Sequence, residues 1–90
     1  MTYSLIARDS DGSIGLIVAS KFFACGAVVP FLSDTVAVAR QAFCNPVWGT
    51  EGRARMMAGE AAQDVLDDLV ARDEGRAIRQ AHMMDGQGRF

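Results

Sequence analysis

Long apolar runs and clusters of basic residues are both missing from this sequence. Its longest apolar stretch, residues 22–32, is interrupted by Gly26 and Pro30, whereas a membrane-spanning helix takes about 20 apolar residues. The 9 Lys and Arg against 11 Asp and Glu give a net charge of -2, and no basic patch is available to neutralise nucleic-acid phosphates. We therefore expect neither a membrane nor a nucleic acid as a partner.

Signals for export and for metal binding are also absent. The N-terminus reaches Arg8 and Asp9 before a signal-type apolar segment develops, and no cleavage site follows. Cys25 and Cys44 do not form a Cys-x-x-Cys pair, so neither a zinc site nor a disulfide framework is indicated. We expect a cytoplasmic protein with free thiols, no metal and no cofactor.

What is present is one small, apolar domain. A chain of 90 residues, 50% of them hydrophobic, can bury one core, so we treat residues 1–90 as a single domain. Residues 3–8 and 14–19 are apolar runs joined by a turn that contains Asp-Gly, which predicts a β-hairpin. Because both runs are apolar at consecutive positions, we expect both faces of this sheet to be covered.

A second hairpin is predicted further along the chain. Residues 28–32 and 35–39 are apolar and are separated by Ser33 and Asp34. Pro30 lacks an N–H group, so it belongs at a sheet edge or a bulge.

A pair of helices follows. Residues 50–59 predict a helix with Thr50 as the N-cap, Glu51 in the first turn and Gly59 at the end. A second helix is predicted over about residues 60–72, where apolar side chains recur at helical spacing. We expect the two helices to form a layer on a sheet.

One further strand is predicted over residues 78–84, and it runs into turn-forming residues 85–88 with no second strand after them. One side of that strand stays unpaired unless another segment or subunit supplies a partner. The whole pattern predicts an α+β fold with two antiparallel hairpins, a helix pair and one further strand.

Thr2 is the first candidate for chemistry. After loss of Met1 it would carry a hydroxyl and a free α-amine on one residue. The α-amine has an ordinary pKa of about 7.7 to 8.0, so it can take the hydroxyl proton near neutral pH. An ordinary strand threonine is the alternative interpretation.

Four segments carry a resemblance to a known family. They are residues 2–9 (TYSLIARD), 15–24 (GLIVASKFFA), 26–30 (GAVVP) and 41–46 (QAFCNP). In this order and spacing they resemble the start of the prokaryotic family named domain of unknown function 1028, which is assigned to the N-terminal-nucleophile (Ntn) hydrolase superfamily.

The resemblance implies a partial four-layer αββα sandwich, with Thr2 as nucleophile and base in the hydrolysis of an amide-type bond in a small molecule or peptide. It also implies that residues 1–90 are the N-terminal part of a longer domain. Ser20 stands where proteasome-like members place an acidic residue, and residues 28–32 offer no lysine equivalent. The mechanism of those members is therefore not carried over.

Four other residues are candidates for the site. Ser20 and Lys21 follow the second strand and can hydrogen-bond the amine or an oxyanion, although a solvated surface pair is the alternative. Gln41 and Asn45 can offer amide donors to a substrate, although Asn45 before a proline can simply form a turn.

Two further hypotheses remain open. Cys25 or Cys44 with His82, the single histidine, would make a Cys–His hydrolase, but nothing in the sequence places them together. Alternatively, the chain is a non-catalytic truncated remnant, or a subunit that completes its sheets by forming a homo-oligomer.

Overall fold

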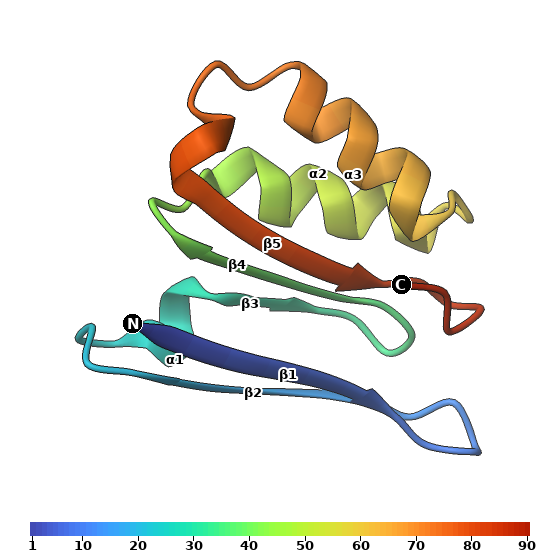
Figure 1. Cartoon of the computed structure of the whole chain (residues 1–90). Coiled ribbons are helices and arrows are strands. Elements are labelled where there is room, and N and C mark those ends of the chain that lie inside the picture. The colour runs from blue at the N-terminus through green and yellow to red at the C-terminus, as the bar shows by residue number, and fades with distance from the viewer.

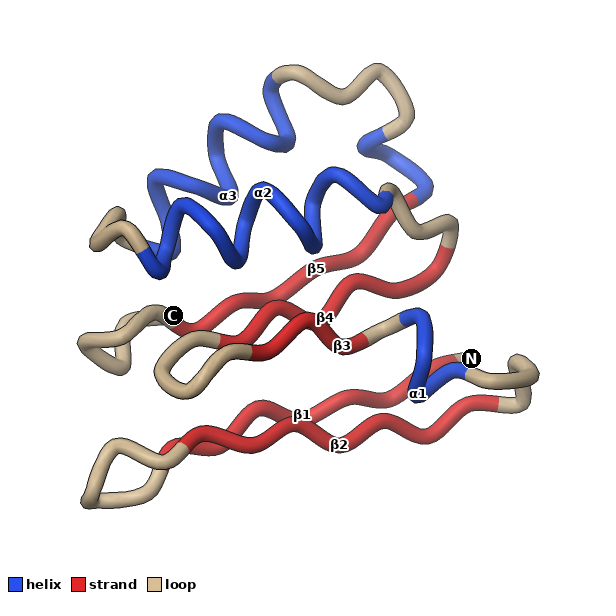
Figure 2. The backbone as a smooth tube through the Cα atoms, turned by 180° about the vertical axis from the view of Figure 1, so that it is seen from behind, coloured by secondary structure: helices blue, strands red, loops and turns tan.

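Two antiparallel sheets are stacked in the computed structural model, which describes residues 1–90 (Figure 1). The elements are β1 (Thr2–Arg8), β2 (Ile14–Ser20), α1 (Cys25–Val28), β3 (Pro30–Leu32), β4 (Ala37–Ala42), α2 (Pro46–Met57), α3 (Ala62–Ala71), a 3-10 turn (Arg76–Ile78) and β5 (Arg79–Met84). One sheet is β1–β2 and the other has the order β3-β4-β5. Figure 2 shows α2 and α3 on one face of the three-stranded sheet and the β1–β2 sheet on its other face. The predicted α+β fold with two hairpins, a helix pair and one further strand is confirmed.

The first hairpin forms where the sequence predicts it. Its register runs from Thr2 opposite Ser20 to Arg8 opposite Ile14. In the turn, the Asp9 N–H donates to the Ser13 carbonyl at 2.8 Å, and Gly12 has a φ of +92°, which glycine adopts without strain. This turn fixes Thr2 and Ser20 as direct cross-strand partners.

The two faces of this hairpin differ. Side chains alternate between a half-buried inward face and an exposed outward face along both strands. On the outward face Tyr3, Leu5 and Ile17 are 67%, 57% and 68% exposed. The expectation that both faces are covered is wrong for this hairpin, because the outward side chains are exposed and both long helices, α2 and α3, lie on the far side of the other sheet. The strand that is covered on both faces is instead β4, where residues 37–40 are all buried between the helices and the hairpin.

The second hairpin is shorter than predicted. Val28 ends a single helical turn, α1, in which the Val29 N–H donates to the Cys25 carbonyl at 2.9 Å. β3 therefore begins at Pro30, on an edge of the sheet as expected for a residue without an N–H group. β4 begins at Ala37 instead of residue 35, because the Ser33 Oγ accepts from two backbone N–H groups of the intervening turn.

Helix α2 begins earlier than predicted. Asn45 is its N-cap, since the Asn45 Oδ1 accepts from the Val47 N–H at 3.0 Å. Pro46 occupies the first helical position, where the missing N–H group costs nothing. The assignment of Thr50 as the N-cap was wrong, because Thr50 lies inside the helix and donates to the Pro46 carbonyl. Gly59, with a φ of +103°, follows the helix end as predicted.

The apolar core lies between the helix pair and the three-stranded sheet. It consists of Val36, Val38, Trp48, Met56, Ala62, Val65, Leu69 and Met83. The space between the two sheets also holds polar groups, because β1 presents Thr2 and Ser4 to it. The candidate site lies at this end of β1. β5 pairs with β4 alone, so its second edge is unpaired, as expected.

Candidate functional site

Thr2 is the first residue of β1, and its side chain points inward between the sheets. The Thr2 Oγ1 lies 2.9 Å from the Ser20 Oγ on the neighbouring strand. The Ser20 Oγ also accepts from the Phe22 N–H at 3.1 Å and contacts the Met1 carbonyl at 3.5 Å. Two of the predicted site residues, Thr2 and Ser20, are therefore in direct contact.

A pocket of about 390 Å³ opens beside Thr2. It is lined by Thr2, Phe22, Cys25, Val28, Val29, Gln41, Ala42, Phe43, Cys44, Ile78 and Arg79. Most of its wall is apolar, and Thr2, Gln41 and Arg79 supply polar groups to it. This combination is typical of sites that bind a small molecule and orient it with a few polar contacts.

Gln41, another predicted site residue, holds the main chain of Thr2. Its Nε2 donates to the Thr2 carbonyl at 3.2 Å and to the Gln80 Oε1 at 2.9 Å. Its Oε1 accepts from the Ser4 Oγ at 2.7 Å. Gln41 thus links the first residue of β1 to the facing sheet.

Ser4 has a second partner, His82, whose Nε2 lies 2.7 Å from the Ser4 Oγ. Ser4 and His82 come from β1 and β5, on facing sheets. Burial lowers the pKa of His82 below its usual value of 6.5, and no charged group contributes to the shift. The imidazole is therefore mainly neutral at pH 7.

The remaining predicted residues are placed differently. Lys21 is exposed and makes no hydrogen bond or ion pair within the chain. Asn45 uses its Oδ1 as the helix cap and donates from its Nδ2 to the Asp73 Oδ2 at 2.8 Å. Both polar atoms of Asn45 are thus engaged in contacts that hold α2 against the segment before β5.

The Asp73 carboxylate is the centre of that contact. Arg79 Nε donates to it at 2.6 Å, and the Gly75 N–H at 2.8 Å. The hydrogen bonds from Arg79 and Asn45 lower the pKa of Asp73 to about 2.

Cysteine chemistry is not assembled here. Both cysteines are free, and the Cys44 Sγ–H points to the Arg40 carbonyl at 3.3 Å. His82 is hydrogen-bonded to Ser4 and to neither cysteine. No group of three His, Cys, Asp or Glu side chains is arranged to hold a metal ion. The helices are too short or too polar for any of them to cross a lipid bilayer.

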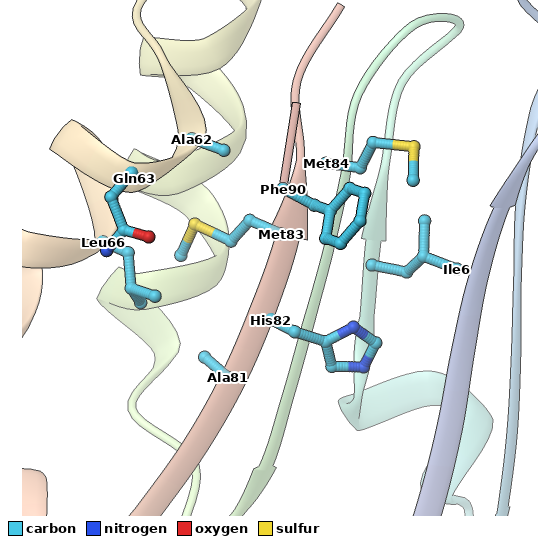
Figure 3. Close-up of a pocket in the computed structure, with 9 residues that line it drawn as sticks. All are labelled: Ile6, Ala62, Gln63, Leu66, Ala81, His82, Met83, Met84 and Phe90. Atoms are coloured by element: carbon cyan, nitrogen blue, oxygen red, sulfur yellow. The ribbon is translucent and has the colours of Figure 1, made fainter. Parts of the chain in front are cut away.

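A second pocket, of about 280 Å³, lies at the unpaired edge of β5 (Figure 3). Ile6, His82, Met84 and Phe90 border it on the β1 side of the strand, and residues of α3 border it on the other (Figure 3). His82 therefore reaches both this pocket and, through Ser4 and Gln41, the surroundings of Thr2.

Comparison with known proteins identifies the family. A model described as a family of unknown function, DUF1028, matches residues 2–90. The chain belongs to the DUF1028 family. The resemblance drawn from the four sequence segments is confirmed at this level.

A solved structure agrees with this assignment. The crystal structure of protein SPO2555 from Silicibacter pomeroyi, itself described as DUF1028, is similar to this chain with a TM-score of 0.91 and 28% sequence identity. The match covers 98% of this chain and 42% of that chain, so this chain spans less than half of the length of its DUF1028 relative. A search of the curated proteins gave no match.

Two residues of this DUF1028 site were missed from the sequence. Ser4 was not considered, and His82 was weighed only as a partner for cysteine. Ser4 lies two positions after Thr2 on a strand, which places both side chains on one face, and this was the available signal. His82 is 78 residues away from Ser4, and no local pattern connects them.

Proposed function

We propose that the chain is an Ntn-type hydrolase of an amide-type bond, with the Thr2 hydroxyl as nucleophile and the freed Thr2 α-amine as base. The observation that carries the proposal is the position of Thr2 in the wall of a mostly apolar pocket, with Ser20 against its hydroxyl and Gln41 on its carbonyl. Its substrate would be a small molecule or a peptide of the cytoplasm.

The reaction would proceed in two halves. The Thr2 Oγ bonds to the carbonyl carbon as the α-amine takes the hydroxyl proton, and the tetrahedral intermediate places negative charge on the carbonyl oxygen. The C–N bond then breaks, and the ammonium returns the proton to the leaving nitrogen. Water next adds to the Thr2 ester, again giving a proton to the amine, and the acid is released as the proton returns to Oγ.

Removal of Met1 is the step that would activate Thr2. The Met1 side chain is 91% exposed, so the residue is open to an aminopeptidase, and Thr2 is small enough for initiator removal. Loss of Met1 also removes the carbonyl that the Ser20 hydroxyl contacts, which frees that hydroxyl for the new amine or for an oxyanion.

Intact-mass analysis tests the proposal directly. We expect the purified protein to lack Met1 and to gain the full mass of one small peptide epoxyketone, a reagent that bonds to both the hydroxyl and the amine of an N-terminal threonine. Thr2→Ala should give no adduct and Thr2→Ser should restore it. Retention of Met1, or an unmodified Thr2 after exposure to a panel of such reagents, would rule out the mechanism for this chain.

For the architecture, we propose that this chain forms part of a four-layer αββα sandwich. The outward face of β1–β2 is apolar and exposed, as expected of a sheet face that a further helical layer covers. The longer chain of SPO2555 leaves room for such a layer.

The second candidate function is a non-catalytic subunit that self-associates. The same exposed residues, Tyr3, Leu5 and Ile17, favour it, because an apolar patch can bury itself against a second copy related by two-fold symmetry. Light scattering after size exclusion should then give a dimer mass, and Ile17→Lys should give a monomer. A wild-type monomer would contradict this candidate and leave the hydrolase proposal in place.

A further inference from the structure

We propose that Ser4 and His82 are positioning residues for Thr2, acting through Gln41. The proposal deepens the proposed hydrolase function, but the geometry on which it stands concerns the position of Thr2 and does not depend on a reaction. The supporting observation is a chain of hydrogen bonds from Thr2 to His82 in which the donor and the acceptor of every bond can be assigned.

The Thr2 carbonyl sets the direction at one end. A backbone carbonyl oxygen can only accept a hydrogen bond. The atom of the Gln41 side chain that faces it at 3.2 Å must therefore be the amide nitrogen. This orientation leaves the Gln41 Oε1, which also can only accept, facing the Ser4 hydroxyl at 2.7 Å.

Ser4 must then give its single proton to Gln41. The remaining contact of the Ser4 Oγ, with the His82 Nε2 at 2.7 Å, has to be one in which Ser4 accepts. His82 therefore carries a proton on Nε2, and its Nδ1 is the atom that titrates. In this arrangement Ser4 is not a nucleophile activated by His82, because its proton is directed away from the imidazole.

The chain of hydrogen bonds connects the two facing sheets at Thr2, the proposed nucleophile. Thr2 and Ser4 lie on β1, Gln41 on β4 and His82 on β5. Without it, Thr2 at the start of β1 would be hydrogen-bonded to β2 alone, through the strand pairing and the Ser20 hydroxyl. Tying the Thr2 carbonyl to the central strand of the other sheet fixes the main chain from which both the hydroxyl and the amine project.

The surroundings of His82 support this role. The side chains that line its pocket carry no charge, and burial alone lowers the pKa of His82. Protonation of Nδ1 would keep the proton on Nε2, so the link to Ser4 survives in both charge states. A Ser4–His82 contact that does not depend on pH suits a site whose general base is the Thr2 α-amine and not the histidine.

Nitrogen NMR of His82 and the Thr2 Hα–Hβ coupling constant test the proposal in the full chain. For the wild type we expect the Nε2–H tautomer and a coupling constant of a single Thr2 rotamer. Ser4→Ala should give an averaged coupling and slow modification of Thr2 by the epoxyketone by about tenfold to a hundredfold, because small displacements of a reacting group are costly. Ser4→Thr should restore both, and Ser10→Ala, in the exposed turn, should change neither.

Gln41→Glu separates the two halves of the chain of bonds. A carboxylate of the same shape still accepts from Ser4 but cannot donate to the Thr2 carbonyl. We expect the His82 tautomer to persist while the Thr2 coupling becomes averaged and its modification slows. An Nδ1–H tautomer in the wild type, or a Thr2 coupling unchanged in Ser4→Ala or in Gln41→Glu, would overturn the proposal. A wild-type Thr2 that is ordered but unreactive would instead overturn the hydrolase function and leave the positioning role standing.

Discussion

The hydroxyl oxygens of Thr2 and Ser20 lie 2.9 Å apart, across the first pair of residues in the β1–β2 hairpin. The register that brings them together is set by the turn at the far end of the hairpin, where Arg8 faces Ile14. Ser20 is thus the side chain best placed to direct the Thr2 hydroxyl.

Ser20→Ala should slow the modification of Thr2 clearly while lowering the stability of the fold only a little. We expect modification of Thr2 by the epoxyketone to slow by about tenfold, with a loss of unfolding free energy of about 1 kcal/mol, typical of one hydrogen bond. Mass spectrometry over time and urea unfolding measure the two effects. Ser10→Ala is the matched control and should behave as wild type, whereas an unchanged rate in Ser20→Ala would show that Ser20 does not direct the hydroxyl.

Asp73 should make the free energy of unfolding depend on pH in the acidic range. Its pKa is lowered to about 2 in the folded protein, chiefly by Arg79 and then by Asn45, and an unfolded aspartate titrates near 3.9. A lowered pKa stabilises the fold fully above about pH 4, and the stabilisation is lost as the pH falls from about 4 towards 2. Urea unfolding at several pH values should show this loss in the wild type and a flatter dependence in Asp73→Asn. Asp34→Asn, at an exposed turn position, should retain the wild-type slope.

Asp85 should be needed for stability although it lies outside every helix. It is 1% exposed and accepts from the Ala62 N–H at 2.9 Å, from the Gln87 N–H at 2.9 Å and from the Arg89 side chain at 2.8 Å. Asp85→Ala leaves these donors without an acceptor, which we expect to cost about 1 to 3 kcal/mol of unfolding free energy. Urea unfolding measures this, with Asp34→Ala as the control. A loss of unfolding free energy no larger than that of the control would contradict the role of Asp85 as the acceptor for the Ala62 N–H at the start of α3.

Gly49 should not tolerate a side chain. A Cβ at this position of α2 would lie 2.5 Å from the Cδ2 of Phe31. The guanidinium groups of Arg40 and Arg53 both lie over the Phe31 ring, 4.7 and 5.4 Å from its centroid, and hold it in place. Gly49→Ala should therefore cost about 1 to 3 kcal/mol through overpacking, measured by thermal or urea unfolding. Gly26→Ala meets no atom within 4 Å and should be neutral, and equal stability of the two variants would contradict the close contact.

Local chemistry made the elements of the fold predictable. The hairpin of residues 2–20 and the stop at Gly59 follow from turn and cap residues alone. The start of α2 was placed late because Asn45 and Pro46 were interpreted as a turn, although the same two residues make an N-cap and a first helical position. The single turn of α1 has no side-chain cap, so no sequence signal marks it.

The candidate site was predictable only in part. Thr2 could be identified from the chemistry of an N-terminal hydroxyl and amine, and Gln41 from the hydrogen-bond donors of its side-chain amide. Ser4 and His82 meet through the stacking of two sheets, and that stacking depends on contacts distant in sequence. Lys21 follows Ser20 in sequence, but strand alternation directs neighbouring side chains to opposite faces, and Lys21 is exposed.

The first turn of α3 has no cap of its own, and its acceptor is the carboxylate of Asp85, 23 residues further along the chain. During synthesis on the ribosome, the Ala62 N–H group is hydrogen-bonded to water until β5 emerges and docks, and only then does Asp85 replace the water as its acceptor. The helix pair and the strand that carries His82 are therefore expected to consolidate together. The cap of α3 and the placement of His82 beside Ser4 would then form in one late step.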